Sequence, residues 1–198
     1  MLILKKVAIT GGLASGKSTV CHLFKELGAY VVSADTIVHD LLSSDPHIIK
    51  QVVQLLGPSI CNKEGIDRKK IAELVFSDPI KLRALEAILH PTVKQEITRH
   101  YEQVKDNSSY PFFVVEIPLL YETGMEGWFD IVITVSTDLS IACSRYLQQA
   151  GRKQKDFETR MKYQKTNSEK QAKADFVIFN NGDLTNLKKD VVSLFQQL

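Results

Sequence analysis

The stretch "TGGLASGKST", ten residues into the chain, constrains the fold more than any other feature of the sequence. It fits the pattern G-x-x-x-x-G-K-[ST] through Gly11, Gly16, Lys17 and Ser18. Between a strand and a helix, this pattern forms a loop whose backbone N–H groups surround phosphates, while the lysine reaches the outer phosphates and the serine can bind Mg²⁺. A glycine turn that serves packing alone is the alternative. The full spacing favours a nucleoside triphosphate site.

Five short apolar runs predict the strands of a sheet, at residues 7–10, 29–32, 112–115, 131–135 and 176–179. These runs are apolar throughout instead of alternating, which is typical of strands covered by helices on both faces. Helical patterns lie between them and can supply the crossover connections. The sequence therefore predicts the α/β class, with a three-layer, doubly wound, five-stranded parallel sheet.

The second and third predicted strands are separated by about eighty residues of mostly helical pattern, far more than one crossover needs. We therefore expect an inserted helical subdomain. Within it, Asp78-Pro79 is a helix start signal. His90-Pro91 predicts a turn, because the residue before a proline is disfavoured in the helical region.

Composition excludes several classes of protein. The 198 residues suffice for one compact domain, and 25 basic against 23 acidic residues are too evenly balanced for a general nucleic-acid binder. Cys21, Cys61 and Cys143 lack the spacing of a disulfide framework or a structural zinc site. No apolar run approaches the ~20 residues of a membrane span. We expect a cytoplasmic protein with neither nucleic-acid nor membrane partners.

A triphosphate site alone leaves the reaction open. A switch GTPase would carry a guanine-reading NKxD motif, which this sequence lacks, and large ATPases need a longer chain. A small-molecule kinase remains, and it needs a carboxylate near the acceptor hydroxyl. Asp35, just beyond the second strand at the ligand-binding edge of the sheet, could accept the hydroxyl proton or could cap a helix beginning at Thr36. Ser33 and Asp40 are weaker alternatives to Asp35. Glu116 and Glu122 could contact Mg²⁺-bound water or the acceptor, or they could be helix caps.

Further motifs are spread over the chain. They are "LGAYVVSADTIVH" at 27–39, "GIDRKKIAELVF" at 65–76, "LEAILHPTV" at 85–93, "EIPLLYETG" at 116–124 and "ADFVIFNNG" at 174–182. The phosphate loop is generic, but these elements in this order are specific together, and they closely resemble one family, dephospho-coenzyme A kinase. The resemblance implies transfer of the γ-phosphoryl of MgATP to the ribose 3′-hydroxyl of dephospho-coenzyme A. The alternatives are another nucleotide or metabolite kinase and a non-catalytic ATP-binding regulatory module.

The resemblance also implies roles for individual residues. Asp35 matches the catalytic base, Lys17 serves phosphoryl transfer, Arg145 matches a lid arginine that faces the transferring phosphate, and Ser18 is the Mg²⁺ ligand. The ATP-binding residues it implies are Thr10, Gly12, Leu13, Ala14, Ser15, Gly16, Lys17, Ser18 and Thr19, with Asn180 and Gly182 on the adenine side.

By the same resemblance, the chain is a single domain of the P-loop kinase type with a core at about 1–38, 110–138 and 166–198. The helical insertion at about 39–109 would bind the coenzyme, and residues 139–165 would form a lid. Residues 152–173 hold eight basic and three acidic side chains, which suits a flap over anionic substrates.

The sequence departs from the family pattern at two places. Ser33 stands where an aspartate is common. The lid sequence "RYLQQAG" has Gln149 where the family has an arginine, and Arg152 is the candidate substitute. His90 matches the family's HP element, where it either contacts a ligand or shapes the turn, and we favour the turn.

Overall fold

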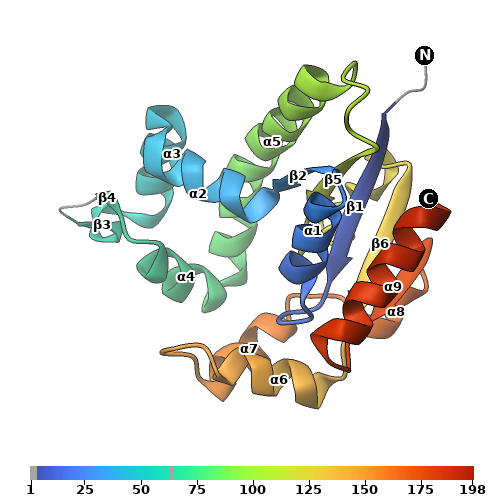
Figure 1. The fold of residues 1–198 in the computed structure, drawn as a ribbon. Coiled ribbons are helices and arrows are strands. Elements are labelled where there is room, and N and C mark those ends of the chain that lie inside the picture. Colours follow the sequence, from blue (N-terminus) through green and yellow to red (C-terminus); the bar gives the residue numbers. More distant parts are fainter. Residues whose placement is uncertain (1–3, 63–64) are drawn as a thin grey trace. The chain divides into compact units, whose positions relative to one another are not determined.

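The computed structural model describes residues 4–62 and 65–198, which divide into two compact units (Figure 1). The first unit comprises the described residues up to Ser33 together with His100–Leu198, and the second comprises Ala34–Arg99.

A five-stranded parallel sheet forms the centre of the first unit, in the order β2-β5-β1-β6-β7. All five predicted strands are present, and each observed strand begins and ends within two residues of the predicted positions. They are β1 (Lys5–Gly11), β2 (Tyr30–Ser33), β5 (Phe112–Glu116), β6 (Ile131–Ser136) and β7 (Phe176–Phe179). β1 is the central strand and pairs with β5 on one side and β6 on the other. The loop that follows β1 therefore emerges from the middle of the sheet.

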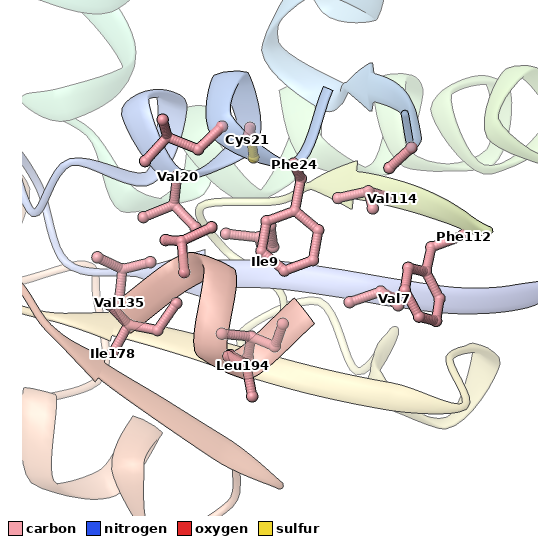
Figure 2. Packing of buried hydrophobic residues seen from close by; sticks show 14 of the residues in the cluster. Val7, Ile9, Val20, Cys21, Phe24, Phe112, Val114, Val135, Ile178 and Leu194 are labelled. Carbon is pink, nitrogen blue, oxygen red and sulfur yellow. The ribbon is translucent and has the colours of Figure 1, made fainter. Parts of the chain in front are cut away.

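Helices α1 (Lys17–Glu26) and α9 (Leu184–Gln197) pack on one face of this sheet. Alternate strand residues point into the resulting core, as Figure 2 shows for Val7, Ile9 and Val114 beside Phe24 of α1 and Leu194 of α9. These side chains are almost completely buried. Apolar side chains at every second strand position thus fix α1, and with it the end of the glycine loop, against the sheet.

The opposite face carries the intervening strand residues. There Phe113 meets the rings of Tyr101 and Trp128 at centroid distances of 5.3 and 6.2 Å, and α8 (Asn167–Gln171) lies against β6. Burial on both faces explains why the strand sequences are apolar throughout. The remaining elements of this unit are a short 3₁₀ turn, η2 (Glu126–Trp128), and helices α6 (Leu139–Leu147) and α7 (Gln154–Met161).

The second unit is helical, as its pattern predicts. Its elements are α2 (Ala34–Ser44), α3 (Pro46–Leu56), η1 (Pro58–Ile60), α4 (Arg68–Phe76) and most of α5 (Pro79–Val104), with a two-stranded hairpin of β3 (Cys61–Asn62) and β4 (Gly65–Ile66) that the sequence did not predict. Asp45 and Asp67 cap α3 and α4 by accepting hydrogen bonds from first-turn N–H groups.

The turn predicted at His90-Pro91 is wrong, because α5 continues through Pro91 to Val104. Leu85, Leu89 and Val93 are all buried and recur every four residues across the proline. A proline inside a helix removes a hydrogen bond and costs about 3 kcal/mol. Burial of this apolar stripe on both sides of Pro91 outweighs that local cost. The helix start predicted at Asp78-Pro79 is confirmed, with Asp78 accepting from the N–H groups of Ile80 and Lys81.

Candidate functional site

At both ends of the loop between β1 and α1, the backbone leaves no room for a side chain, so glycine is required. A Cβ on Gly11 would lie 2.2 Å from the carbonyl oxygen of Val135, and one on Gly16 would lie 2.2 Å from Nδ2 of Asn180. Gly16 also has a φ of +93°, in the left-handed region. Because Gly16 offers no side chain to cap α1, the first-turn N–H groups need another acceptor, a role that a phosphate oxygen can fill.

Lys17 begins α1 and is buried, with its ammonium turned back into the loop. Its Nζ donates to the carbonyl oxygens of Gly11 at 3.2 Å and Gly12 at 2.8 Å. Ser15 contributes a second polar group here, a buried hydroxyl without a hydrogen-bond partner among the described residues. The loop therefore holds a cation and an unsatisfied donor, the combination that suits an anionic ligand.

Ser18 lies beside a carboxylate from the neighbouring strand. Its Oγ donates to Oε1 of Glu116 over 2.7 Å, and Glu116 is the buried last residue of β5, in register with Ile9 of β1. Burial and the negative charge of Glu116 raise the pKa of the nearby Cys21 thiol well above its usual value. Cys21 is therefore a neutral packing residue, and the Ser18–Glu116 pair places a hydroxyl and a carboxylate beside the loop.

Residues far apart in sequence meet at the carbonyl oxygen of Ser15. Asn180, just after β7, donates to it from Nδ2 at 2.8 Å, and Thr137, just after β6, donates from Oγ1 at 3.0 Å. Arg145 of α6 donates from Nη1 to the carbonyl oxygen of Asn180 at 3.0 Å. The ends of three strands and α6 are thus joined around the glycine loop.

Helices α6 and α7 pack against the flank of the same loop. Ala142, Tyr146 and Phe157 form a buried cluster, against which Leu13 and Ala14 pack. The guanidinium carbon of Arg152 lies 5.1 Å from the ring centroid of Tyr146, within cation–π range.

Three polar residues of this region, Thr137, Asn167 and Lys170, were not among the predicted site residues. Asn167, the first residue of α8, donates from Nδ2 to the carbonyl oxygen of Thr137 at 2.8 Å, and its Oδ1 lies 3.0 Å from where a Cβ on Gly12 would be. Lys170 is completely buried and its Nζ pairs with Oε1 of Glu122 at 3.2 Å. Burial lowers the pKa of Lys170, and the charge of Glu122 opposes this. Glu122, predicted as a ligand contact or a cap, lies in an ion pair with Lys170.

The structure also describes three other predicted residues, Asp35, His90 and Gly182. Asp35 belongs to the second unit and lies in the first turn of α2, which begins at Ala34, so the predicted cap of a helix starting at Thr36 is wrong. His90 lies within α5. Gly182 has room for a Cβ, whose nearest neighbour would be Asn186 at 3.6 Å.

Within residues 4–62 and 65–198, no three His, Cys, Asp or Glu side chains gather as a metal-ligand set. In the same part of the chain, no helix is both long and apolar enough to cross a membrane.

Sequence comparison decides the family. A model of the family described as dephospho-CoA kinase matches residues 5–186. The chain belongs to the dephospho-CoA kinase family. A similar relative is the dephospho-CoA kinase of Protochlamydia amoebophila, which is 47% identical over 100% of this chain and 98% of its own length.

Solved structures are similar along the whole chain as well. A dephospho-CoA kinase from Campylobacter jejuni has a TM-score of 0.70 and 28% identity, covering 97% of this chain and 96% of that one. A Thermus thermophilus protein has a TM-score of 0.83 and 29% identity, covering 100% and 99%. Dephospho-CoA kinase family membership therefore rests on both sequence and fold.

Proposed function

We propose that the chain transfers the γ-phosphoryl of MgATP to the ribose 3′-hydroxyl of dephospho-coenzyme A, giving coenzyme A and ADP. The observation that carries this proposal is the full-length identity of 47% to a protein named dephospho-CoA kinase. The completeness of the glycine loop, with Lys17 directed into it, supports it independently.

The loop from Gly12 to Thr19, with Thr10 before it, would bind the phosphates of ATP. Its glycines allow close approach of the backbone, and the positive end of α1 favours negative charge. Lys17 would exchange its contacts with the loop carbonyls for phosphate oxygens. Since the cation stays in place while charge develops on the transferring group, Lys17 would stabilise the transition state.

Ser18 and Glu116 fit a Mg²⁺ site, because a hydroxyl and a carboxylate oxygen lie 2.7 Å apart beside the loop. Mg²⁺ takes oxygen ligands, keeps several waters and needs few protein groups. When bound, the ion would neutralise charge on the phosphates. Ser18 would be a direct ligand, and Glu116 would accept a hydrogen bond from Ser18 or from a metal-bound water.

Asp35 would act as the general base. Its carboxylate would take the proton of the 3′-hydroxyl while that oxygen forms its bond to the γ-phosphorus. The bond from the γ-phosphorus to the bridging oxygen breaks, and that oxygen leaves with ADP. Arg145 would face the transferring phosphate, and Asn180 and Gly182 would border the adenine side.

The remaining parts would position the acceptor and exclude water. The second unit would bind dephospho-coenzyme A, and residues 139–165 would act as a lid whose basic side chains neutralise the substrates' phosphates. A closed lid prevents water from taking the phosphoryl group in place of the acceptor. The cytoplasmic location and the lack of nucleic-acid and membrane partners stay predictions.

The test is ADP formation by the purified protein with MgATP, with and without dephospho-coenzyme A, beside AMP and shikimate as control acceptors. We expect stimulation by dephospho-coenzyme A alone and coenzyme A as the product by mass. A folded Lys17→Ala protein should lose this turnover. ATP binding without stimulation by any acceptor would support the regulatory-module alternative, and stimulation by another acceptor would contradict the substrate assignment.

A further inference from the structure

Lys170 occupies an unusual environment for a lysine. Its side chain is 0% exposed, although lysine is among the residue types least often buried. The ammonium donates to the carbonyl oxygen of Pro118 at 3.0 Å and pairs with Oε1 of Glu122 at 3.2 Å. Both partners belong to the segment that follows β5, so the ion pair joins α8 to that segment.

The same two acceptors hold further parts of the first unit. Oε1 of Glu122 also accepts the N–H of Lys165 at 2.7 Å, and Lys165 is the last residue of the proposed lid. The carbonyl oxygen of Pro118 also lies 3.4 Å from the Oγ1 of Thr10, which donates to it from the end of β1. The ion pair therefore lies where the base of the lid, α8 and the strand before the phosphate loop come together.

Helix α8 connects this ion pair to the phosphate loop. Thr166 and Glu169 form a reciprocal capping box that fixes the first turn of the helix. Asn167 lies one turn before Lys170, and it contacts Thr137 and reaches Gly12 of the loop. Displacement of Lys170 would therefore shift Asn167 relative to the phosphate loop.

We propose that Glu122 and Lys170 are a positioning pair for phosphoryl transfer, which holds the base of the lid and Asn167 in register with the phosphate loop. The proposal rests on the proposed function. A buried ion pair is seldom more stable than apolar side chains of the same volume. Apolar side chains could fill this space, but only the charged pair links these particular atoms, and geometry at the reacting group controls the rate of transfer.

The experiment separates positioning from stability. Lys170→Met leaves the Glu122 carboxylate buried without its cation and should lower the melting temperature. The double variant Glu122→Gln/Lys170→Met removes both charges, and we expect it to regain most of the lost melting temperature. Its kcat should still lie roughly 10- to 100-fold below the wild type, with the KM for dephospho-coenzyme A changed less than about threefold. Lys105→Met, which breaks a surface pair with Glu102, is the matched control and should leave kcat unchanged.

Recovery of kcat together with melting temperature in the double variant would overturn the proposal, because the pair would then act on stability alone. If the double variant does not fold, Glu122→Gln is measured instead, since its amide oxygen can still accept from Lys165. A low kcat in that folded protein supports the proposal, and a normal kcat refutes it.

Binding of ADP, measured by calorimetry, tests the role of the Glu122–Lys170 pair separately from the proposed function. A wild type without dephospho-coenzyme A-dependent turnover would contradict the proposed function, and the pair would then be judged by ADP binding alone. We expect the stable double variant to bind ADP about 3- to 10-fold more weakly, a loss of up to ~1.4 kcal/mol. Unchanged ADP affinity in that case would refute the pair's role at the phosphate loop.

Discussion

Replacing Gly16 by alanine should destabilise the first unit through a defined collision. Gly16 has a φ of +93°, and its new Cβ would lie 2.2 Å from Nδ2 of Asn180. That amide is buried and donates to the carbonyl oxygen of Ser15 at 2.8 Å. Asn180 must therefore move away and lose this hydrogen bond, or the loop backbone must shift.

Two contributions set the expected loss in the free energy of unfolding. A left-handed backbone costs a residue with a Cβ about 1–2 kcal/mol, and a buried polar group deprived of its partner costs about 1–3 kcal/mol. Thr137 still donates to the carbonyl oxygen of Ser15, which favours the lower half of the second range. We therefore expect a loss of about 2–4 kcal/mol. For a chain of this size, that corresponds to a fall in melting temperature of roughly 5–15 °C.

The assay is thermal unfolding of Gly16→Ala, Asn180→Ala and the double variant. Because Asn180→Ala removes the colliding amide, the double variant should lose less stability than the sum of the losses in the two single variants. Gly124→Ala is the matched control, since Gly124 has a φ of +65° but nothing within 4 Å of its Cβ position. It should show the backbone contribution alone. If Gly16→Ala melts no lower than Gly124→Ala, or the cycle is additive, the collision does not determine stability.

Three further predictions concern single side chains. Asp35→Asn should lower kcat by roughly 10²–10⁴-fold while ADP still binds by calorimetry, and normal turnover would remove Asp35 as the base. Arg152→Ala should lower kcat more than Lys153→Ala, because Arg152 is held over the ring of Tyr146, whereas equal effects would show that Arg152 replaces no lid cation. Hydrogen bonds from Thr166 hold the pKa of Glu169 below its ordinary value, so the cap stabilises the fold above that ordinary pKa and is lost as pH falls through the lowered one. The stability difference between wild type and Glu169→Ala in urea should therefore shrink between about pH 7 and about pH 3, and a difference that stays constant would contradict this assignment.

The sheet could be predicted from the sequence because its signal is local. Each strand is a short apolar run, and the strands are buried on both faces, so no alternation of polar residues confuses the pattern. The phosphate loop could also be predicted, because Gly11, Gly16, Lys17 and Ser18 lie within eight residues of one another. Such contacts depend little on the rest of the fold.

The continuation of α5 through Pro91 could not be predicted from the dipeptide alone. The proline penalty is local, whereas the compensating burial depends on the whole stripe from Leu85 to Val93 and beyond. The spacing of four residues across the proline was the available signal. It shows that tertiary packing can override a strong local preference.

The polar contacts around the loop join residues that are far apart in sequence, so no local sequence pattern indicates them. Asn180 and Ser15 are 165 residues apart, and Thr137 and Ser15 are 122 apart. Lys170 lies in a basic segment that resembles a solvated surface, yet its side chain is completely buried. A single sequence does not distinguish a buried lysine from an exposed one, because the carboxylate that compensates it comes from another segment.

The position of β1 in the sheet has a consequence for synthesis on the ribosome. β1 is made first, but both of its partners, β5 and β6, begin more than a hundred residues later. β2 is made soon after β1, yet it pairs with β5 and not with β1. A nascent chain that ends at Pro111 therefore carries two apolar strands, neither of which has a native neighbour in the sheet yet. At about 5–20 residues per second, the central strand waits several seconds for its neighbours, and during that interval it is a substrate for chaperones and for aggregation.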